Sequence, residues 1–207
     1  MSPIHYPKGS VPPLAKETQS QKKARKSPTS ARSLMKIAPG NRGMSFEAMI
    51  NESNAYYKEK GLCLVTKRPT PIKVLSVDYE HGPRITDAFY EKQSTTDYNG
   101  VYQGHYLDFE AKETQSKTSF PLANIPIQQI EHLEGVIEQG GIAFFLIHFA
   151  KFQETYLIPA SMVTSFYHEK KRASIPYETF RRDGYLVNEG LRPRLDYLPV
   201  LVKAFNL

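Results

Sequence analysis

The stretch DYNGVYQGHYLDFEAK, residues 97–112, decides the fold because it joins a glycine-containing segment to an alternating run of apolar and charged residues. Residues 107–112 carry apolar side chains at the odd positions and Asp108, Glu110 and Lys112 at the even ones. Such alternation predicts a strand with one face on a core and a second face that presents two acids and a lysine. Side chains two residues apart on a strand lie roughly 6 to 7 Å apart. The polar groups can therefore converge on one ion and one phosphate.

Asp97 precedes this strand in D-Y-N-G, a turn-like sequence in which Gly100 would tolerate a positive φ. A turn here would fold Asp97 back beside Glu110. Carboxylates are hard oxygen ligands suited to Mg²⁺, which completes its octahedron with water and substrate phosphate. A nearby ammonium, here that of Lys112, stabilises the nucleophile or the developing negative charge. The pattern predicts a metal-dependent nuclease site, in which Asp108 is either a further ligand or directed to solvent.

The same residues admit plainer interpretations. E-x-K on a strand is also typical of a surface ion pair. Glu47 is either a further metal or water contact or an acid that favours the dipole at a helix start. Gln128 and Gln129 open a predicted helix, where an amide either orients substrate or water or is merely exposed.

Composition restricts the class of protein. The 207 residues, 40% of them hydrophobic, suffice for one core with appendages, and we expect one catalytic domain. Cys63 is the only cysteine, so a disulfide within the chain and a cysteine-rich zinc site are excluded, and we expect a buried, inert thiol. The sequence contains no signal peptide and no membrane-length apolar run, which favours a soluble, cytoplasmic protein without a membrane partner. Zinc-protease, serine-hydrolase and glycine-rich phosphate-loop motifs are absent.

The net charge of +6 is unevenly distributed. Residues 1–43 hold nine Lys or Arg and one acid, whereas the rest of the chain holds 18 basic and 20 acidic residues. With its Pro, Ser, Thr and Gln, this segment predicts a flexible basic arm, followed by a nuclease domain at 44–207. Such an arm either binds nucleic acid through phosphates or serves as a disordered solubilising tail.

The remaining sequence predicts alternating helices and strands. Ser45 is expected to cap a helix that ends at Gly61. Residues 62–66 and 72–77 are expected to be two strands of one sheet, and residues 172–194 are loop-like. Further helices are expected at 127–139, 160–171 and 197–205, and further strands from 107, at 142–149 and at 155–158. This order predicts an α/β fold with a central mixed sheet flanked by helices.

Residues 79–95 mix Gly, Pro, charged and aromatic residues without a clean period. We expect a protruding loop or stalk there. Its Gly82-Pro83 pair would stiffen a bend, and its basic and aromatic side chains suit contacts with phosphates and exposed bases. Those side chains are Arg84, Phe89, Tyr90 and Lys92.

Five motifs together resemble one family, the RecU Holliday junction resolvases of Gram-positive bacteria. They are N-R-G-M-S-F-E (41–47), K-R-P-T-P (67–71), S-T-T-D-Y-N-G-V-Y-Q-G-H-Y-L-D-F-E-A-K-E-T (94–114), S-F-P-L (119–122) and Q-I-E-H (129–132). The resemblance implies a restriction-endonuclease-like fold, a homodimer, and Mg²⁺-dependent symmetric nicking of four-way DNA junctions in recombination and repair. Mn²⁺ is the alternative ion.

The resemblance also assigns roles to individual residues. Asp97 and Glu110 become metal ligands and Lys112 the catalytic lysine, while Glu47 completes the metal site and Gln129 assists from the following helix. It makes 79–95 the family's stalk. Branched DNA is the implied substrate, with recombinase and branch-migration proteins as further partners. Arg42, together with Lys67 or Arg68, lies in motifs that would contact DNA phosphates.

Three functions are compatible with these features. The leading one is a structure-selective endonuclease, a Holliday junction resolvase. A sequence-specific restriction-type endonuclease is disfavoured because the chain is small and has no obvious recognition domain. A non-catalytic DNA-binding modulator of recombination is disfavoured by the intact set of Asp97, Glu110 and Lys112.

Overall fold

A computed structural model of the chain describes residues 41–91 and 95–207, and of residues 41–45 only the backbone. Most of the predicted basic arm at 1–43, the side chain of Arg42, and Lys92 therefore lie outside the described residues. Within the described ranges, no helix is long and apolar enough to cross a membrane.

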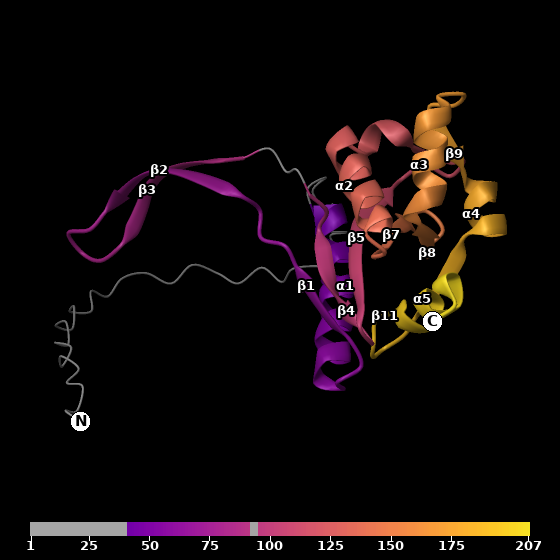
Figure 1. Ribbon diagram of the computed structural model, residues 1–207, viewed down its shortest axis with the longest axis horizontal. Helices are drawn as coiled ribbons and strands as arrows, with labels where there is room; N and C mark the ends of the chain where they lie inside the picture. Colours follow the sequence, from indigo (N-terminus) through magenta and orange to yellow (C-terminus); the bar gives the residue numbers. More distant parts are fainter. Residues whose placement is uncertain (1–40, 92–94) are drawn as a thin grey trace, which may run out of the picture. The chain divides into compact units, whose positions relative to one another are not determined.

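Seven strands form one mixed sheet in the order β1-β4-β5-β7-β8-β10-β11. Strands β5 and β7 run parallel, and the other neighbouring pairs of this sheet run antiparallel. The predicted α/β class with a central mixed sheet is confirmed. The strands are β1 (Leu64–Lys67), β4 (Tyr98–Tyr102), β5 (His105–Thr114), β7 (Ile142–Phe149), β8 (Glu154–Pro159), β10 (Tyr185–Glu189) and β11 (Leu195–Asp196) (Figure 1).

Helices cover the sheet, and two further strand pairs form small sheets of their own. The helices are α1 (Asn41–Glu59), the 3₁₀ turn η1 (Leu122–Asn124), α2 (Ile127–Glu138), α3 (Ala160–Glu169), α4 (Tyr177–Asp183) and α5 (Leu198–Phe205). The small sheets pair β2 (Ile72–Asp78) with β3 (Arg84–Tyr90), and β6 (Ser119–Pro121) with β9 (Ser174–Pro176).

Strand β7 lies between two hydrophobic clusters, and all eight of its residues are buried. Phe144 packs in a cluster with Ile50 of α1. Phe145, on the opposite face, packs in a second cluster with Ile130 of α2 and Val163 of α3. This confirms the prediction of a strand buried on both sides, which a continuous apolar run indicates.

Two predictions of secondary structure are wrong. Helix α1 begins at Asn41, so Ser45 lies within the helix and does not cap it. The helix includes Gly43 because one helical glycine costs only about 1 kcal/mol, which is too little to end a helix. Residues 172–194 are not a loop: they contain β9, α4 and β10, because the burial of side chains such as Phe180 and Val187 stabilises these short elements.

The predicted turn at 97–100 is a strand. Residues from Tyr98 onward form β4, and the reversal into β5 occurs at Gln103 and Gly104, with φ of 47° and 87°. Gly100 serves a different purpose, since a Cβ there would overlap the Leu64 carbonyl oxygen of β1. The glycine therefore permits β1 and β4 to approach closely.

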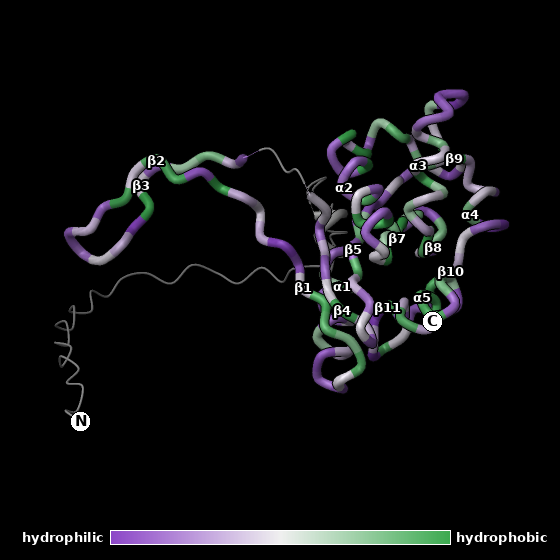
Figure 2. The backbone as a smooth tube through the Cα atoms, in the orientation of Figure 1, coloured by the Kyte–Doolittle hydropathy of each residue, from purple (hydrophilic) through white to green (hydrophobic). Residues whose placement is uncertain are grey.

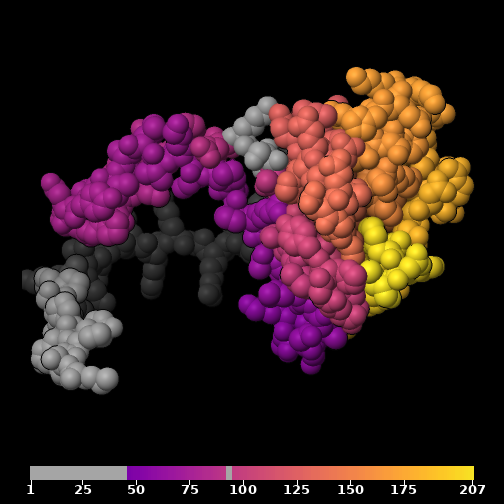
Figure 3. Space-filling model, viewed as in Figure 1, coloured from indigo at the N-terminus to yellow at the C-terminus, as the bar shows by residue number. Residues whose placement is uncertain are grey.

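Strands β1 and β2, predicted as two strands of one sheet, belong to different sheets. Strand β2 instead pairs antiparallel with β3 to form a hairpin, so part of the loop or stalk predicted at 79–95 is a strand. Figure 2 shows that hydrophobic and hydrophilic residues mix along this hairpin, and Figure 3 shows its side chains at the surface. Its exposed apolar residues are Ile72, Val74, Leu75, Tyr79, Ile85, Phe89 and Tyr90.

Gly100→Ala should destabilise the protein by about 1 to 3 kcal/mol, the usual cost of forcing extra atoms into a packed site. The matched control is Gly135→Ala in α2, where an added Cβ meets no atom within 4 Å. It should stabilise by up to about 1 kcal/mol, because alanine favours the helix. Urea unfolding of both variants tests this, and equal effects would contradict the close approach of β1.

Candidate active site

The antiparallel pairing of β4 with β5 brings Asp97 beside Glu110. Tyr98 of β4 pairs with Phe109 of β5. Because the strands are antiparallel, Asp97, which precedes Tyr98, lies opposite Glu110, which follows Phe109. The Asp97 amide donates to Glu110 Oε2 at 3.0 Å, and the Ala111 amide donates to Asp97 Oδ2 at 3.3 Å. The two carboxylates thus face each other across one strand pair, as the sequence predicted, although a sheet rather than a turn places them.

Lys112 and Gln129 converge on Glu110. Lys112 Nζ lies 2.6 Å from Glu110 Oε1, and Gln129 Nε2 donates to the same oxygen at 2.8 Å. Gln129 lies in the first turn of α2, which packs over the face of β5 and β7 that carries Glu110. The structure therefore brings Asp97, Glu110, Lys112 and Gln129 together.

Burial changes the chemistry of Glu110. Its side chain is only 1% exposed, and burial raises its pKa to about 7, with the negative charge of Asp97 acting in the same direction. The Lys112 ammonium opposes this shift but does not cancel it. A second positive charge at this position would favour the carboxylate form further.

The donor set fits a magnesium ion. Gln129 Oε1 is buried and finds no hydrogen-bond partner among the residues that the structure describes. The nitrogen of the same amide contacts Glu110, and an amide oxygen together with carboxylates is a hard ligand set of the kind that Mg²⁺ combines with water. No group of three or more His, Cys, Asp or Glu able to hold a metal occurs in 41–91 or 95–207. A metal held by Asp97 and Glu110 would therefore need further ligands, which backbone carbonyls, amides, water or phosphate can supply.

Glu47 lies on α1, and its carboxylate already has a partner. Its Oε1 is 2.6 Å from Lys67 Nζ, and both side chains are partly exposed. Burial raises the pKa of the Tyr98 hydroxyl, and the charges of Glu47, Asp97 and Glu110 raise it further. The roles of Glu47 at a metal and of Lys67 at a phosphate remain predictions.

Asp108 is not directed to solvent, and the hydrogen-bond partners of its carboxylate in the described part of the chain do not include Asp97 or Glu110. Its side chain is fully buried, and Arg68 Nη2 lies 2.6 Å from Oδ2. The Arg68 side chain is 19% exposed, so its guanidinium is committed largely to the protein. Sequence reasoning missed the other members of this group, Thr96 and Tyr106 among them. Strand parity could have suggested Tyr106, which shares a face with Asp108.

The hairpin carries the remaining predicted DNA contacts. Arg84 lies on β3 opposite Asp78, and the side chains of Phe89 and Tyr90 are 48% and 78% exposed. Lys73 Nζ lies 5.9 Å from the centre of the Phe89 ring. Exposed aromatic and basic groups are available here for a nucleic-acid partner, and their role remains a prediction.

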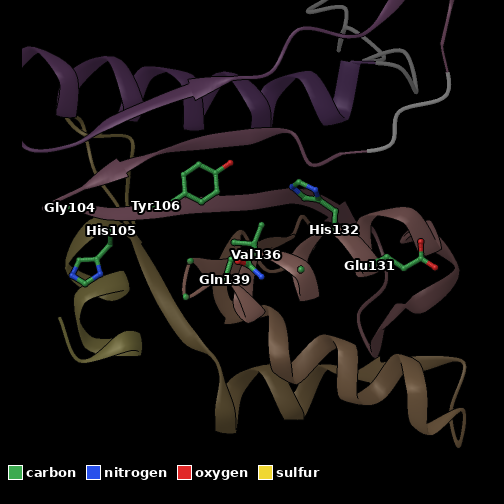
Figure 4. Close-up of a pocket in the computed structure, with 10 residues that line it drawn as sticks. Gly104, His105, Tyr106, Glu131, His132, Val136 and Gln139 are labelled. Carbon is green, nitrogen blue, oxygen red and sulfur yellow. The ribbon is translucent and has the colours of Figure 1, made fainter.

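A hollow of about 690 Å³ lies elsewhere, between the β4–β5 turn and α2. Figure 4 shows Tyr106 from β5 and His132 from α2 among its lining residues. Its lining contains neither Asp97 nor Glu110. The carboxylate pair is therefore separate from this hollow.

Residues 41–203 match the family model described as RecU: Recombination protein U. The chain belongs to this family. The Holliday junction resolvase RecU of Lactococcus lactis subsp. lactis (strain IL1403) is 47% identical over 208 residues, which cover 97% of each chain. The Holliday junction resolvase RecU of Streptococcus sanguinis (strain SK36) is 50% identical over 164 residues, or 78% of this chain and 82% of that protein.

A solved structure of Archaeoglobus fulgidus Hjc, a Holliday junction resolvase from an archaeal hyperthermophile, aligns with a TM-score of 0.35 and 14% identity. The alignment covers 58% of this chain and 75% of that one. This similarity is too low to support an argument, so the family assignment rests on RecU.

Glu110→Gln should stabilise the metal-free protein increasingly as pH rises. Because the pKa rises from 4.5 to about 7 on folding, the folded wild type binds the Glu110 proton more tightly, and its stability falls across that window. The wild type should lose about 3 kcal/mol of unfolding free energy across this window, at 1.36 kcal/mol per pKa unit. Glutamine does not titrate.

The measurement is urea unfolding in EDTA at pH 5 and pH 8. The matched control is Glu138→Gln, which changes an exposed acid at the end of α2. Its free energy of unfolding should follow the wild-type profile. A Glu110→Gln profile parallel to that of the wild type would show that burial does not raise the pKa.

Proposed function

We propose that the chain is a metal-dependent endonuclease that resolves four-way DNA junctions by paired nicking in recombination and repair. The observation that carries this function is the buried carboxylate of Glu110, held between Asp97, Lys112 and Gln129. Membership in the RecU family and relatives named as Holliday junction resolvases support the choice of substrate.

The protein groups divide the chemistry among themselves. Asp97 and Glu110 would hold the ion through their carboxylates, and the Gln129 amide orients Glu110 and would offer its unpartnered oxygen. Mg²⁺, or Mn²⁺ in its place, supplies a polarised phosphate and a water of lowered pKa when bound. The Lys112 ammonium, fixed by Glu110, stabilises negative charge on the nucleophile or on the scissile phosphate. Metal binding requires deprotonated Glu110, so it should strengthen as pH rises through about 7.

Paired nicking implies two active sites. The described part of the chain holds one set of Asp97, Glu110 and Lys112, and two opposed strands of a junction must be cut to give ligatable products. A two-fold symmetric homodimer supplies two equivalent sites in one assembly. Recombinase and branch-migration proteins are the further partners expected for such an enzyme.

DNA contacts are assigned to three groups. The basic arm at 1–43, with Arg42, would bind phosphates without regard to sequence or shape. Lys67 would contact phosphate near the active site once released from Glu47. The exposed side chains of Arg84, Phe89 and Tyr90 would read the junction, and Lys92, which lies outside the described residues, is proposed to do so with them.

Asp97→Ala and Glu110→Ala should abolish nicking but leave junction binding largely intact, because phosphate contacts elsewhere supply most of the affinity. Lys112→Ala should slow cleavage about a hundredfold or more, since it removes charge stabilisation in the transition state. Cleavage and gel-shift assays on a four-way junction with Mg²⁺ measure both properties. Glu52→Gln and Lys58→Ala, at exposed positions of α1, are the controls.

Mg²⁺-dependent cleavage by the Asp97 or Glu110 variant would disprove the assignment of the metal site. Junction binding without cleavage by the wild type would favour the non-catalytic modulator. Equal cleavage of linear duplex at one sequence would favour the restriction-type enzyme.

Removing the Arg84 and Phe89 side chains to Ala should lower the junction-over-duplex affinity ratio at fixed salt by about tenfold, because base stacking contributes roughly 1 to 3 kcal/mol. The control removes Arg181 and Leu186, an arginine and an apolar residue that are exposed outside the hairpin. Competition binding in EDTA gives the ratio. An unchanged ratio in the hairpin variant would exclude these side chains from junction recognition.

A further inference from the structure

A buried network centred on Asp108 lies directly beside the Asp97–Glu110 pair. Asp108 Oδ2 is 2.6 Å from Arg68 Nη2 and 3.0 Å from His132 Nε2, and it accepts a hydrogen bond from the Tyr106 hydroxyl at 2.9 Å. The Thr96 hydroxyl donates to Oδ1. Four side chains from separate segments thus converge on one carboxylate that is fully buried.

Three members of this network adjoin residues of the active site. Thr96 directly precedes Asp97, and Asp108 lies two residues before Glu110 on the same face of β5. His132 follows Gln129 by three residues on α2, a spacing that places both side chains on one helix face. The network therefore forms a second polar layer, with one member close in sequence to each of Asp97, Glu110 and Gln129.

Arg68 connects this layer to the chain that carries Asp97. Its Nη1 donates to Thr96 Oγ1 at 2.7 Å, and its backbone amide donates to the Asp97 carbonyl oxygen at 2.7 Å. One residue at the end of β1 thus fixes the segment entering β4 at two points. Its Nη2 at the same time bonds Asp108 and the Tyr106 hydroxyl.

We propose that Arg68 and Asp108 are positioning residues that hold Asp97, Glu110 and Gln129 in the geometry that binds a divalent cation. Arg68 then acts inside the protein and not on a DNA phosphate. This inference rests on the proposed function, because it assigns the metal to the same site.

The chemistry of the guanidinium explains the use of arginine. Its planar fork donates in several fixed directions at once, which an ammonium on a flexible stem does not reproduce. Arg68 uses this property to bridge Thr96, Tyr106 and Asp108. Lysine would still serve as a point charge for a phosphate, so Arg68→Lys separates an internal bridge from a DNA contact.

Residues that orient metal ligands typically change metal affinity by about tenfold to a hundredfold when they are removed. Arg68→Lys and Asp108→Asn should therefore weaken metal binding by about this factor. Thr96→Val removes one hydroxyl at nearly constant volume and should have a smaller effect in the same direction. Arg192→Lys is the matched control, because Arg192 Nη2 lies 2.6 Å from Glu59 Oε2 in an exposed pair.

The experiment measures three properties of the full chain. Calorimetric titration gives Mn²⁺ affinity without DNA, and a gel shift in EDTA gives junction affinity. Hydrogen exchange of the amides at 95–98 reports the order of the Asp97 segment in metal-free protein. The network variants should bind Mn²⁺ more weakly and exchange faster at 95–98, with junction affinity within about twofold of wild type. Arg192→Lys should change none of the three.

The inference is overturned if Arg68→Lys weakens junction binding while Mn²⁺ affinity and exchange at 95–98 keep wild-type values. It is also overturned if Thr96→Val and Arg68→Lys both leave Mn²⁺ affinity and exchange unchanged. Thr96→Val keeps the test decisive where Asp108→Asn does not fold. Exchange is measured without metal, so a wild type that binds no Mn²⁺ would refute the proposed function while exchange at 95–98 still tests the positioning role.

Discussion

A stack of three aromatic rings across β4, β5 and β7 sets the geometry on which the site depends. Tyr98 stacks on Phe109 with ring centres 4.8 Å apart, and Phe109 stacks on Phe144 at 4.5 Å. All three rings are fully buried and pair directly across the sheet. A slip of one residue would turn every side chain of a strand to the opposite face. The stack therefore fixes the register that brings Asp97 beside Glu110 on the other face.

Asp108 and Glu110 both lie on the sheet face opposite the aromatic stack, but they differ in how fully protein groups compensate their charges. Asp108 is surrounded by donors from Arg68, Thr96 and Tyr106 within the protein. Glu110 has Lys112 and Gln129, yet burial still raises its pKa to about 7. Asp108 is compensated by donors within the protein, whereas Glu110 remains costly to ionise in the metal-free protein. This difference agrees with the proposed role of Glu110 as a metal ligand, because a buried acid retained for function lowers stability.

The packed sheet and the exposed hairpin also differ in what their side chains can do. The seven-stranded sheet and its helices bury the aromatic stack and hold the site residues rigidly. The β2–β3 hairpin exposes Phe89 and Tyr90 and forms a sheet by itself. The proposed catalytic residues thus lie on the packed scaffold, and the exposed apolar side chains of the hairpin suit recognition of a large partner.

The sequence by itself determined the elements whose patterns are local. Alternation at 107–112 predicted the faces of β5, and a continuous apolar run predicted β7, because side-chain period and length follow from backbone geometry. The residues Asp97, Glu110, Lys112 and Gln129 were also named from sequence, the last through family resemblance, and the structure brings them together.

Only the tertiary structure decided which strands are neighbours and which charges are buried. D-Y-N-G resembles a turn, but pairing with β1 and β5 makes it a strand, and Gly100 is required by the approach of Leu64. Arg68 resembles a surface cation, yet Asp108, 40 residues away in the chain, draws it inward. Such outcomes depend on partners distant in sequence, whose desolvation and pairing energies exceed the local preferences that a pattern expresses.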